Sequence, residues 1–124
     1  MNKHWMICAL GLPAFAIAQA QMPTEFPADA SEPTADALRA RLAGNVFTAQ
    51  PFSGPGWRLQ LDSGGYAFID VSTGRSDKGS WRVEGDKLCV DWKVIPSACN
   101  TVRLQGDTVY MKRVNGEVLR MGSR

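Results

Sequence analysis

Residues 79–104 read GSWRVEGDKLCVDWKVIPSACNTVRL, and this stretch decides the fold. Apolar and polar side chains alternate along 79–84, 87–92 and 98–104, which predicts three strands because successive side chains of a strand point to opposite faces. The dipeptide Gly85-Asp86 predicts a two-residue hairpin turn, since glycine comes first as a type II′ turn requires. An antiparallel sheet is therefore expected at the centre of the chain.

The turn fixes which side chains share a face. The expected opposite pairs are Val83 with Leu88, Trp81 with Val90, Gly79 with Trp92 and, on the other face, Glu84 with Lys87 as an ion pair. Continuing through a short loop at 93–95 places Leu88, Val90, Trp92, Ala98, Val102 and Leu104 on the apolar face. The polar face then carries Lys87, Cys89, Asp91, Ser97, Cys99, Thr101 and Arg103.

In this register Cys89 lies directly across from Cys99, which is close enough for a disulfide. The bridge would hold the sheet from its outer face, and closing so short a loop stabilises a fold by roughly 3 kcal/mol at most. A structural bridge is favoured over a reactive one because the two cysteines lack Cys-x-x-Cys spacing.

The amino terminus has the pattern of a secretory signal peptide over residues 1–20. Lys3 and His4 form a short polar start, an apolar stretch runs from 5 to 18, and Ala18-Gln19-Ala20 provides a cleavage site. The apolar stretch is shorter than the ~20 residues of a membrane span, so no membrane anchor is expected after cleavage. The mature protein is therefore predicted to be periplasmic or secreted, where a disulfide persists.

The mature chain is nearly neutral. The full sequence carries 14 Lys and Arg against 12 Asp and Glu, and Lys3 leaves with the signal. The absence of a basic stripe argues against nucleic acid as a partner. Residues 21–30 are rich in proline, alanine and acidic residues and are expected to be a flexible lead. Residues 31–124 are long enough for a single domain.

A helix is expected at the start of this domain. Ser31 or Thr34 can cap it, and Gly44 suits the left-handed residue that ends it. Its apolar side chains recur at helical spacing and are Ala35, Leu38 and Leu42. We expect this stripe to pack over a sheet edge or the end of a barrel.

Strands and turns are expected from residue 45 onward. A strand at 45–49 precedes a loop at 50–56, and 56–62 then forms a hairpin with 65–71 in one of two registers. A two-residue turn places Tyr66 and Phe68 inside but also points Asp70 inward. A three-residue turn leaves both aromatic side chains outside and pairs Arg58 with Asp70. The pattern alone does not choose, because a slip of one residue exchanges the two faces.

The last third repeats the same design. Residues 72–78 are expected to be a polar loop, and Gly106-Asp107 a second two-residue turn. That turn pairs Leu104 with Val109 and Val102 with Met111. A three-residue loop at 114–116 is preferred over an Asn115-Gly116 turn, because it pairs Met111 with Leu119, Val109 with Met121 and Arg113 with Glu117.

The expected strands number eight, joined mostly by tight turns. Consecutive antiparallel strands in this number tend to close on themselves, which removes exposed edges. The predicted fold class is mainly β: a small eight-stranded antiparallel meander or barrel with one N-terminal helix and one disulfide. Whether the barrel encloses a cavity is left open.

The sequence offers little for catalysis. The mature chain has no histidine, because His4 leaves with the signal, and both remaining cysteines are assigned to the bridge. Histidine-dependent nucleophilic sites, thiolate catalysis and imidazole metal centres are therefore not expected. Asp62, Asp70 and Asp91 are the remaining candidates, and such residues are far more often solvated charges on a strand face. We predict no catalytic residue, metal site or cofactor.

Six residues are candidates for binding. Phe52, Trp57, Tyr66 and Phe68 are expected near one barrel mouth, and Val94 and Ile95 at the tip of the bridged hairpin. The predicted function is non-enzymatic binding of a small apolar ligand or a periplasmic protein partner. The alternatives are inhibition of an exported hydrolase, of protease or lysozyme type, through Val94 and Ile95 or the 50–56 loop, and a structural role in the envelope.

A short pattern also suggests a family. Leu42-x-Gly44-Asn45, Gly79-x-Trp81, Leu88-Cys89-x-x-Trp92 and Cys99 follow one another over most of the mature chain. This pattern resembles a group of small secreted proteobacterial domains of unknown function. The resemblance implies export, the disulfide and a lipocalin-like β-architecture, and it brings no activity and no site residues.

Overall fold

The computed structural model describes residue 11 and residues 21–123, so the predicted signal peptide falls almost entirely outside the described residues. The elements are α1 (Ala35–Leu42), β1 (Asn45–Ala49), β2 (Trp57–Leu61), β3 (Tyr66–Val71), β4 (Ser76–Glu84), β5 (Lys87–Trp92), β6 (Ala98–Gln105), β7 (Thr108–Lys112) and β8 (Val118–Ser123). Within this part of the chain, no helix has the length and apolar character needed to cross a membrane.

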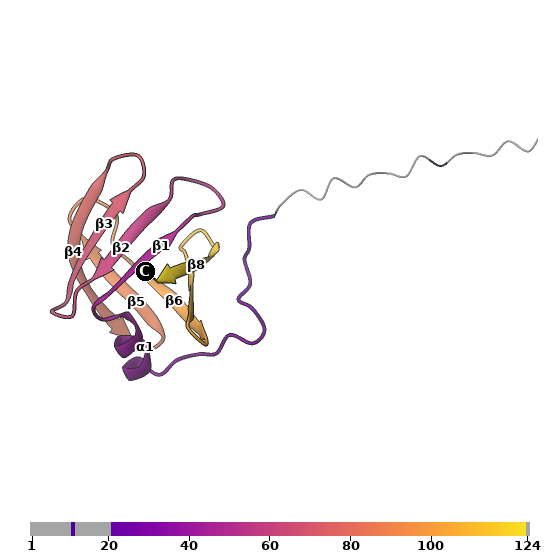
Figure 1. Cartoon of the computed structure of the whole chain (residues 1–124), viewed down its shortest axis with the longest axis horizontal. Coiled ribbons are helices and arrows are strands. Elements are labelled where there is room, and N and C mark those ends of the chain that lie inside the picture. The colour runs from indigo at the N-terminus through magenta and orange to yellow at the C-terminus, as the bar shows by residue number, and fades with distance from the viewer. Residues whose placement is uncertain (1–10, 12–20, 124) are drawn as a thin grey trace, which may run out of the picture.

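The strands of the described chain form one closed antiparallel barrel in sequence order, β1 to β8 (Figure 1). Each strand pairs with the next, and β1 pairs with β8 to close the sheet. Successive connections therefore lie at opposite ends of the barrel. This confirms the predicted fold class.

Helix α1 covers one end of the barrel (Figure 1). Thr34 is its N-cap, and the Thr34 hydroxyl accepts a hydrogen bond from the Ala37 N–H. Leu38 and Leu42 are fully buried in the core, as their spacing predicted. We call the end that α1 covers the helix end; it holds the turns 62–65, 85–86 and 106–107. We call the opposite end the open end; it holds the loops 50–56, 72–75, 93–97 and 113–117.

The central registers are as predicted. Trp81 faces Val90, Cys89 faces Cys99, and the turns at 106–107 and 114–116 give the expected pairs. Gly116 has φ +89°, a left-handed conformation that favours glycine. Glu84 is opposite Lys87 as predicted, but the predicted ion pair between them was wrong. The Glu84 carboxylate accepts a hydrogen bond from Arg82 at 2.9 Å instead.

The β2–β3 hairpin takes the register with the longer turn. Trp57 faces Val71 and Arg58 faces Asp70, with the Arg58 Nη1 and Asp70 Oδ2 atoms 3.7 Å apart. Tyr66 and Phe68 consequently lie on the outer face, 62% and 42% exposed. The alternative register would have turned the charge of Asp70 into an apolar interior, which is costly without a partner.

One strand boundary and the placement of the leading segment differ from the sequence prediction. Strand β4 begins at Ser76, so the loop predicted over 72–78 is shorter, because Ser76 and Asp77 pair with Asp70 and Ile69 of β3. The segment predicted as a flexible lead, 21–30, contacts the barrel instead.

Main-chain bonds hold that leading segment. The Val118 N–H donates to the Pro23 carbonyl at 2.8 Å, and Ser31, the residue directly after the segment, exchanges two main-chain bonds with Leu104. The Arg103 guanidinium lies over the ring of Phe26, 5.4 Å from its centre. The segment therefore covers the outer side of β6 and β8, and this explains why the outward-facing Val118 is buried.

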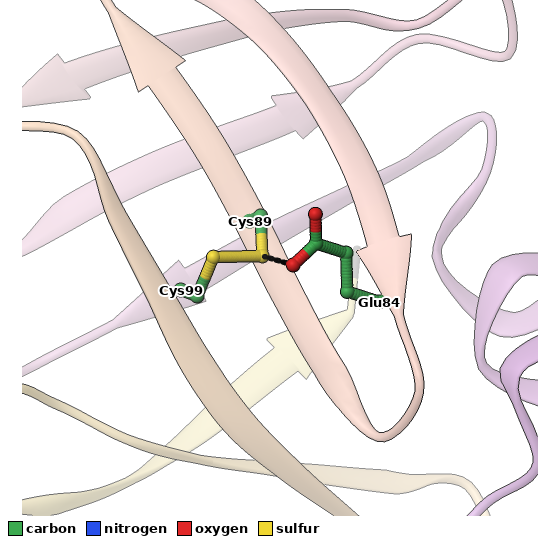
Figure 2. Close-up of side chains that lie close together, drawn as sticks. All are labelled: Glu84, Cys89 and Cys99. Carbon is green, nitrogen blue, oxygen red and sulfur yellow. Dashed lines mark hydrogen bonds between the residues drawn. A yellow bond between two sulfur atoms is a disulfide. The ribbon is translucent and has the colours of Figure 1, made fainter.

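The disulfide joins β5 and β6 on the outer face (Figure 2). Cys89 and Cys99 are directly opposite each other on the two antiparallel strands, and their Cα atoms are 4.0 Å apart. The Glu84 carboxylate lies 3.7 Å from the Cys89 sulfur. Because a disulfide sulfur carries no hydrogen, this is a packing contact and not a hydrogen bond.

Replacing Cys89 and Cys99 together with serine should lower the free energy of unfolding by about 3 kcal/mol, because the unfolded chain then loses its short covalent loop. Urea denaturation of the oxidised protein and the double variant measures the difference. A reductant should destabilise the wild type by a similar amount and leave the variant unchanged. Equal stability of the two oxidised proteins would contradict the structural role.

Gly79 is required by a close approach of two strands. A Cβ atom built there would collide with the carbonyl oxygen of Asp91 and lie 3.0 Å from the Cα of Trp92. Gly79→Ala should therefore cost about 1–3 kcal/mol of unfolding free energy, as overpacking does. The matched control is Gly122→Ala on β8, where the nearest atom would be 3.6 Å away. Similar unfolding midpoints for the two variants would refute this account.

Candidate functional site

The interior of the barrel is filled unevenly. Near the helix end it is packed with fully buried side chains, among them Phe47, Leu61, Leu88 and Val102. Toward the open end the walls leave a cavity of about 450 Å³. This volume lies within the usual range for sites that hold small molecules.

The cavity wall is mainly apolar and comes from most of the barrel. Its larger apolar side chains are Trp57, Leu59, Ile69, Val90, Trp92 and Met111. They belong to β2, β3, β5 and β7, and the loop residues Ile95 and Pro96 line the same space. A ligand in this space would exchange water for hydrocarbon and aromatic surface, the main source of binding free energy for an apolar molecule.

Polar side chains gather in one corner of the cavity. Asn100 lies on β6 opposite Leu88, and Arg113 follows β7 at the open end; both line the cavity. The Arg113 Nη1 atom lies 3.1 Å from the Glu117 Oε1 atom, and Glu117 is only 1% exposed. The other Glu117 oxygen accepts from the Phe52 N–H at 2.7 Å. The buried carboxylate is thus satisfied on both oxygens and holds the guanidinium in place.

A second carboxylate fixes the loop that forms part of the wall. The Asp77 Oδ2 atom accepts the N–H groups of Val94 and Ile95 at 2.9 and 2.8 Å. Bonds from the Ile95 N–H first, and then from Val94, lower the pKa of Asp77. The β5–β6 loop is therefore held with Ile95 against the cavity.

The structure divides the predicted binding residues. Trp57 and Ile95 line the cavity, whereas Phe52, Tyr66, Phe68 and Val94 are exposed. Trp57 and Tyr66 lie at opposite ends of the β2–β3 hairpin, so the four aromatic residues do not gather at one mouth. The sequence prediction grouped these residues because they are aromatic. The register of the three-residue turn places Tyr66 and Phe68 on the outer face instead.

The carboxylates considered for catalysis are also apart. Asp62 lies in a turn at the helix end, where its Oδ1 accepts the Gly64 N–H. Asp70 lies at the other end of the hairpin, and Asp91 is bonded to Arg82 at 2.7 Å on the outer face. The three therefore do not face one another as a pair of acid and base would.

Glu84, Cys89 and Cys99 lie together, as Figure 2 shows. Their ligand atoms fall within 4.8 Å of one another. A cysteine binds metal as a thiolate, and both sulfurs are bonded to each other here. This trio offers no thiolate while the bridge is intact.

The polar corner was missed in the sequence. Asn100 occupies an inward position by simple alternation between Ala98 and Val102, and that alternation was the available signal. Arg113 and Glu117 were recognised as a pair but were assigned no role in a site. Their importance follows from burial, which the sequence does not show.

Comparison with protein-family models, curated proteins and solved structures gave no match for this chain. The resemblance to small secreted proteobacterial domains therefore stays a prediction.

The Asp77 bonds predict a pH-sensitive loop. Since the folded-state pKa of Asp77 is lowered, the carboxylate stabilises the loop fully above the ordinary aspartate pKa of about 3.9 and loses this effect as pH falls through the lowered value.

Asp77→Ala should lower the hydrogen-exchange protection of the Val94 and Ile95 amides several-fold at neutral pH. NMR measures this exchange. Asp70→Ala is the control, because Asp70 contacts Arg58 instead, and unchanged protection in Asp77→Ala would argue against the loop bonds.

Proposed function

We propose that this chain is a non-enzymatic binding protein that holds a small, largely apolar ligand inside its barrel. The observation that carries this proposal is the cavity of about 450 Å³ at the open end of an otherwise packed interior. Small-molecule sites are typically concave, mainly apolar and equipped with a few polar groups, and this cavity has all three properties.

The rigidity of the walls supports the same proposal. Strands supply most of the lining, the Asp77 bonds hold the β5–β6 loop, and Glu117 holds Arg113. A preformed site loses little conformational entropy on binding, because its loops are already ordered, and this favours affinity for a small molecule.

The loop at 93–97 fits a ligand-binding role better than the inhibitor hypothesis. Ile95 lines the cavity, so of the expected apolar tip only Val94 points away, 75% exposed. The Cys89–Cys99 bridge is compatible with an oxidising compartment, which supports the proposal that the ligand is met in the periplasm or outside the cell.

Filling the cavity should abolish binding while the fold survives. Ala98→Phe adds an aromatic ring to the cavity wall and should raise the Kd of the neutral fluorescent probe N-phenyl-naphthylamine by tenfold or more. That change corresponds to about 1.4 kcal/mol of binding free energy. Energy transfer from Trp57 and Trp92, which line the cavity, reports binding directly.

The matched control is Thr101→Phe, which adds the same ring on the outer face of β6, where Thr101 faces Lys87 and Lys112. It should leave the probe Kd unchanged. Equal weakening by both variants, or a wild type that binds no probe, would defeat the proposal.

A further inference from the structure

We infer that the ligand is an amphipathic monocarboxylate, with its hydrocarbon chain in the apolar cavity and its carboxylate against Arg113 and Asn100. This inference rests on the proposed function and adds the chemical class of the ligand. Two observations carry it: the position of the two residues in the cavity wall and the hydrogen-bonding state of the Arg113 guanidinium.

Arg113 and Asn100 are neighbours on the inner face. The β6–β7 register pairs Val102 with Met111 and Thr101 with Lys112. One step further along this register brings Asn100 opposite Arg113. Both residues line the cavity, whose wall is otherwise mainly apolar, and an amide and a guanidinium can offer N–H donors to an acceptor placed between them.

The ion pair with Glu117 holds the Arg113 guanidinium in place but uses only part of its hydrogen-bonding capacity. Within the described chain the Arg113 side chain makes one side-chain hydrogen bond, from Nη1 to Glu117, out of the five N–H donors that a guanidinium has. Its side chain is 34% exposed. Donors remain to bind a carboxylate with the two-pronged geometry that arginine favours.

A neutral or cationic head group fits the corner less well. An alcohol has one acceptor oxygen and no charge for Arg113. An alkylammonium brings only donors and a positive charge, which arginine repels. The three head groups on one hydrocarbon chain therefore give a direct test.

The experiment measures displacement of N-phenyl-naphthylamine from the whole mature protein by dodecanoate, dodecanol and dodecylammonium, below the concentrations at which they form micelles. Dodecanoate should bind tightest, at least tenfold tighter than dodecanol, and dodecylammonium weakest. Equal affinities of the acid and the alcohol would overturn the inference and leave the proposed function standing. If the probe binds but none of the three amphiphiles displaces it, the inference is overturned; if the probe itself does not bind, the proposed function falls and this inference with it.

Variants then locate the head group. Asn100→Leu and Arg113→Gln should each weaken dodecanoate five- to tenfold or more and change the dodecanol affinity little, whereas Arg120→Gln on the outer face of β8 should change neither. Arg113→Gln leaves the buried Glu117 without its ion pair, so probe binding and the thermal midpoint are measured first. If that variant unfolds, Asn100→Leu and Arg113→Lys decide, with the lysine variant expected to retain part of the preference for the acid. Unchanged dodecanoate affinity in a folded corner variant would overturn the assignment.

Discussion

The short pairing between β1 and β8 is the constraint on which the rest of the structure depends. Phe47 pairs with Ser123 and Thr48 with Gly122, and these contacts turn a meander into a closed barrel. Closure gives the sheet an inside, so each inward side chain meets residues from across the barrel as well as from neighbouring strands. The bond from the Phe52 N–H to Glu117 links the two loops that flank this seam at the open end. One buried carboxylate thus serves both the seam and the orientation of Arg113.

The strand pattern could be predicted because it depends on local chemistry. Gly-Asp dipeptides marked two turns, and alternation then determined the pairs on both sides of each turn, including Cys89 with Cys99. The loop at 114–116 was preferred because the two-residue turn would have set the apolar Leu119 against the charged Lys112. These inferences use only neighbours along the chain or across one turn, where the sequence is informative.

The site could not be predicted to the same depth. The cavity depends on which side chains meet across the closed barrel, and that depends on strand tilt and closure, which no single hairpin reveals. Asn100 was overlooked because a lone polar residue in an apolar strand has no meaning until its surroundings are known. The leading segment was missed for another reason: main-chain atoms make the bonds of Pro23 and Ser31, and main-chain atoms have no sequence signature.

Among the described residues, Leu38, Leu42 and the packed half of the interior fill the barrel near the helix end, so the cavity lies toward the open end. An amphipathic ligand would then enter with its apolar chain first and leave with its polar head group first, because entry and release would use the same end of the barrel. Departure would begin by breaking the polar contacts at the rim, before any hydrocarbon is uncovered. The dissociation rate of such a ligand would then depend on the few hydrogen-bond donors that hold its head group. The apolar walls of the cavity would instead set the length of chain that fits.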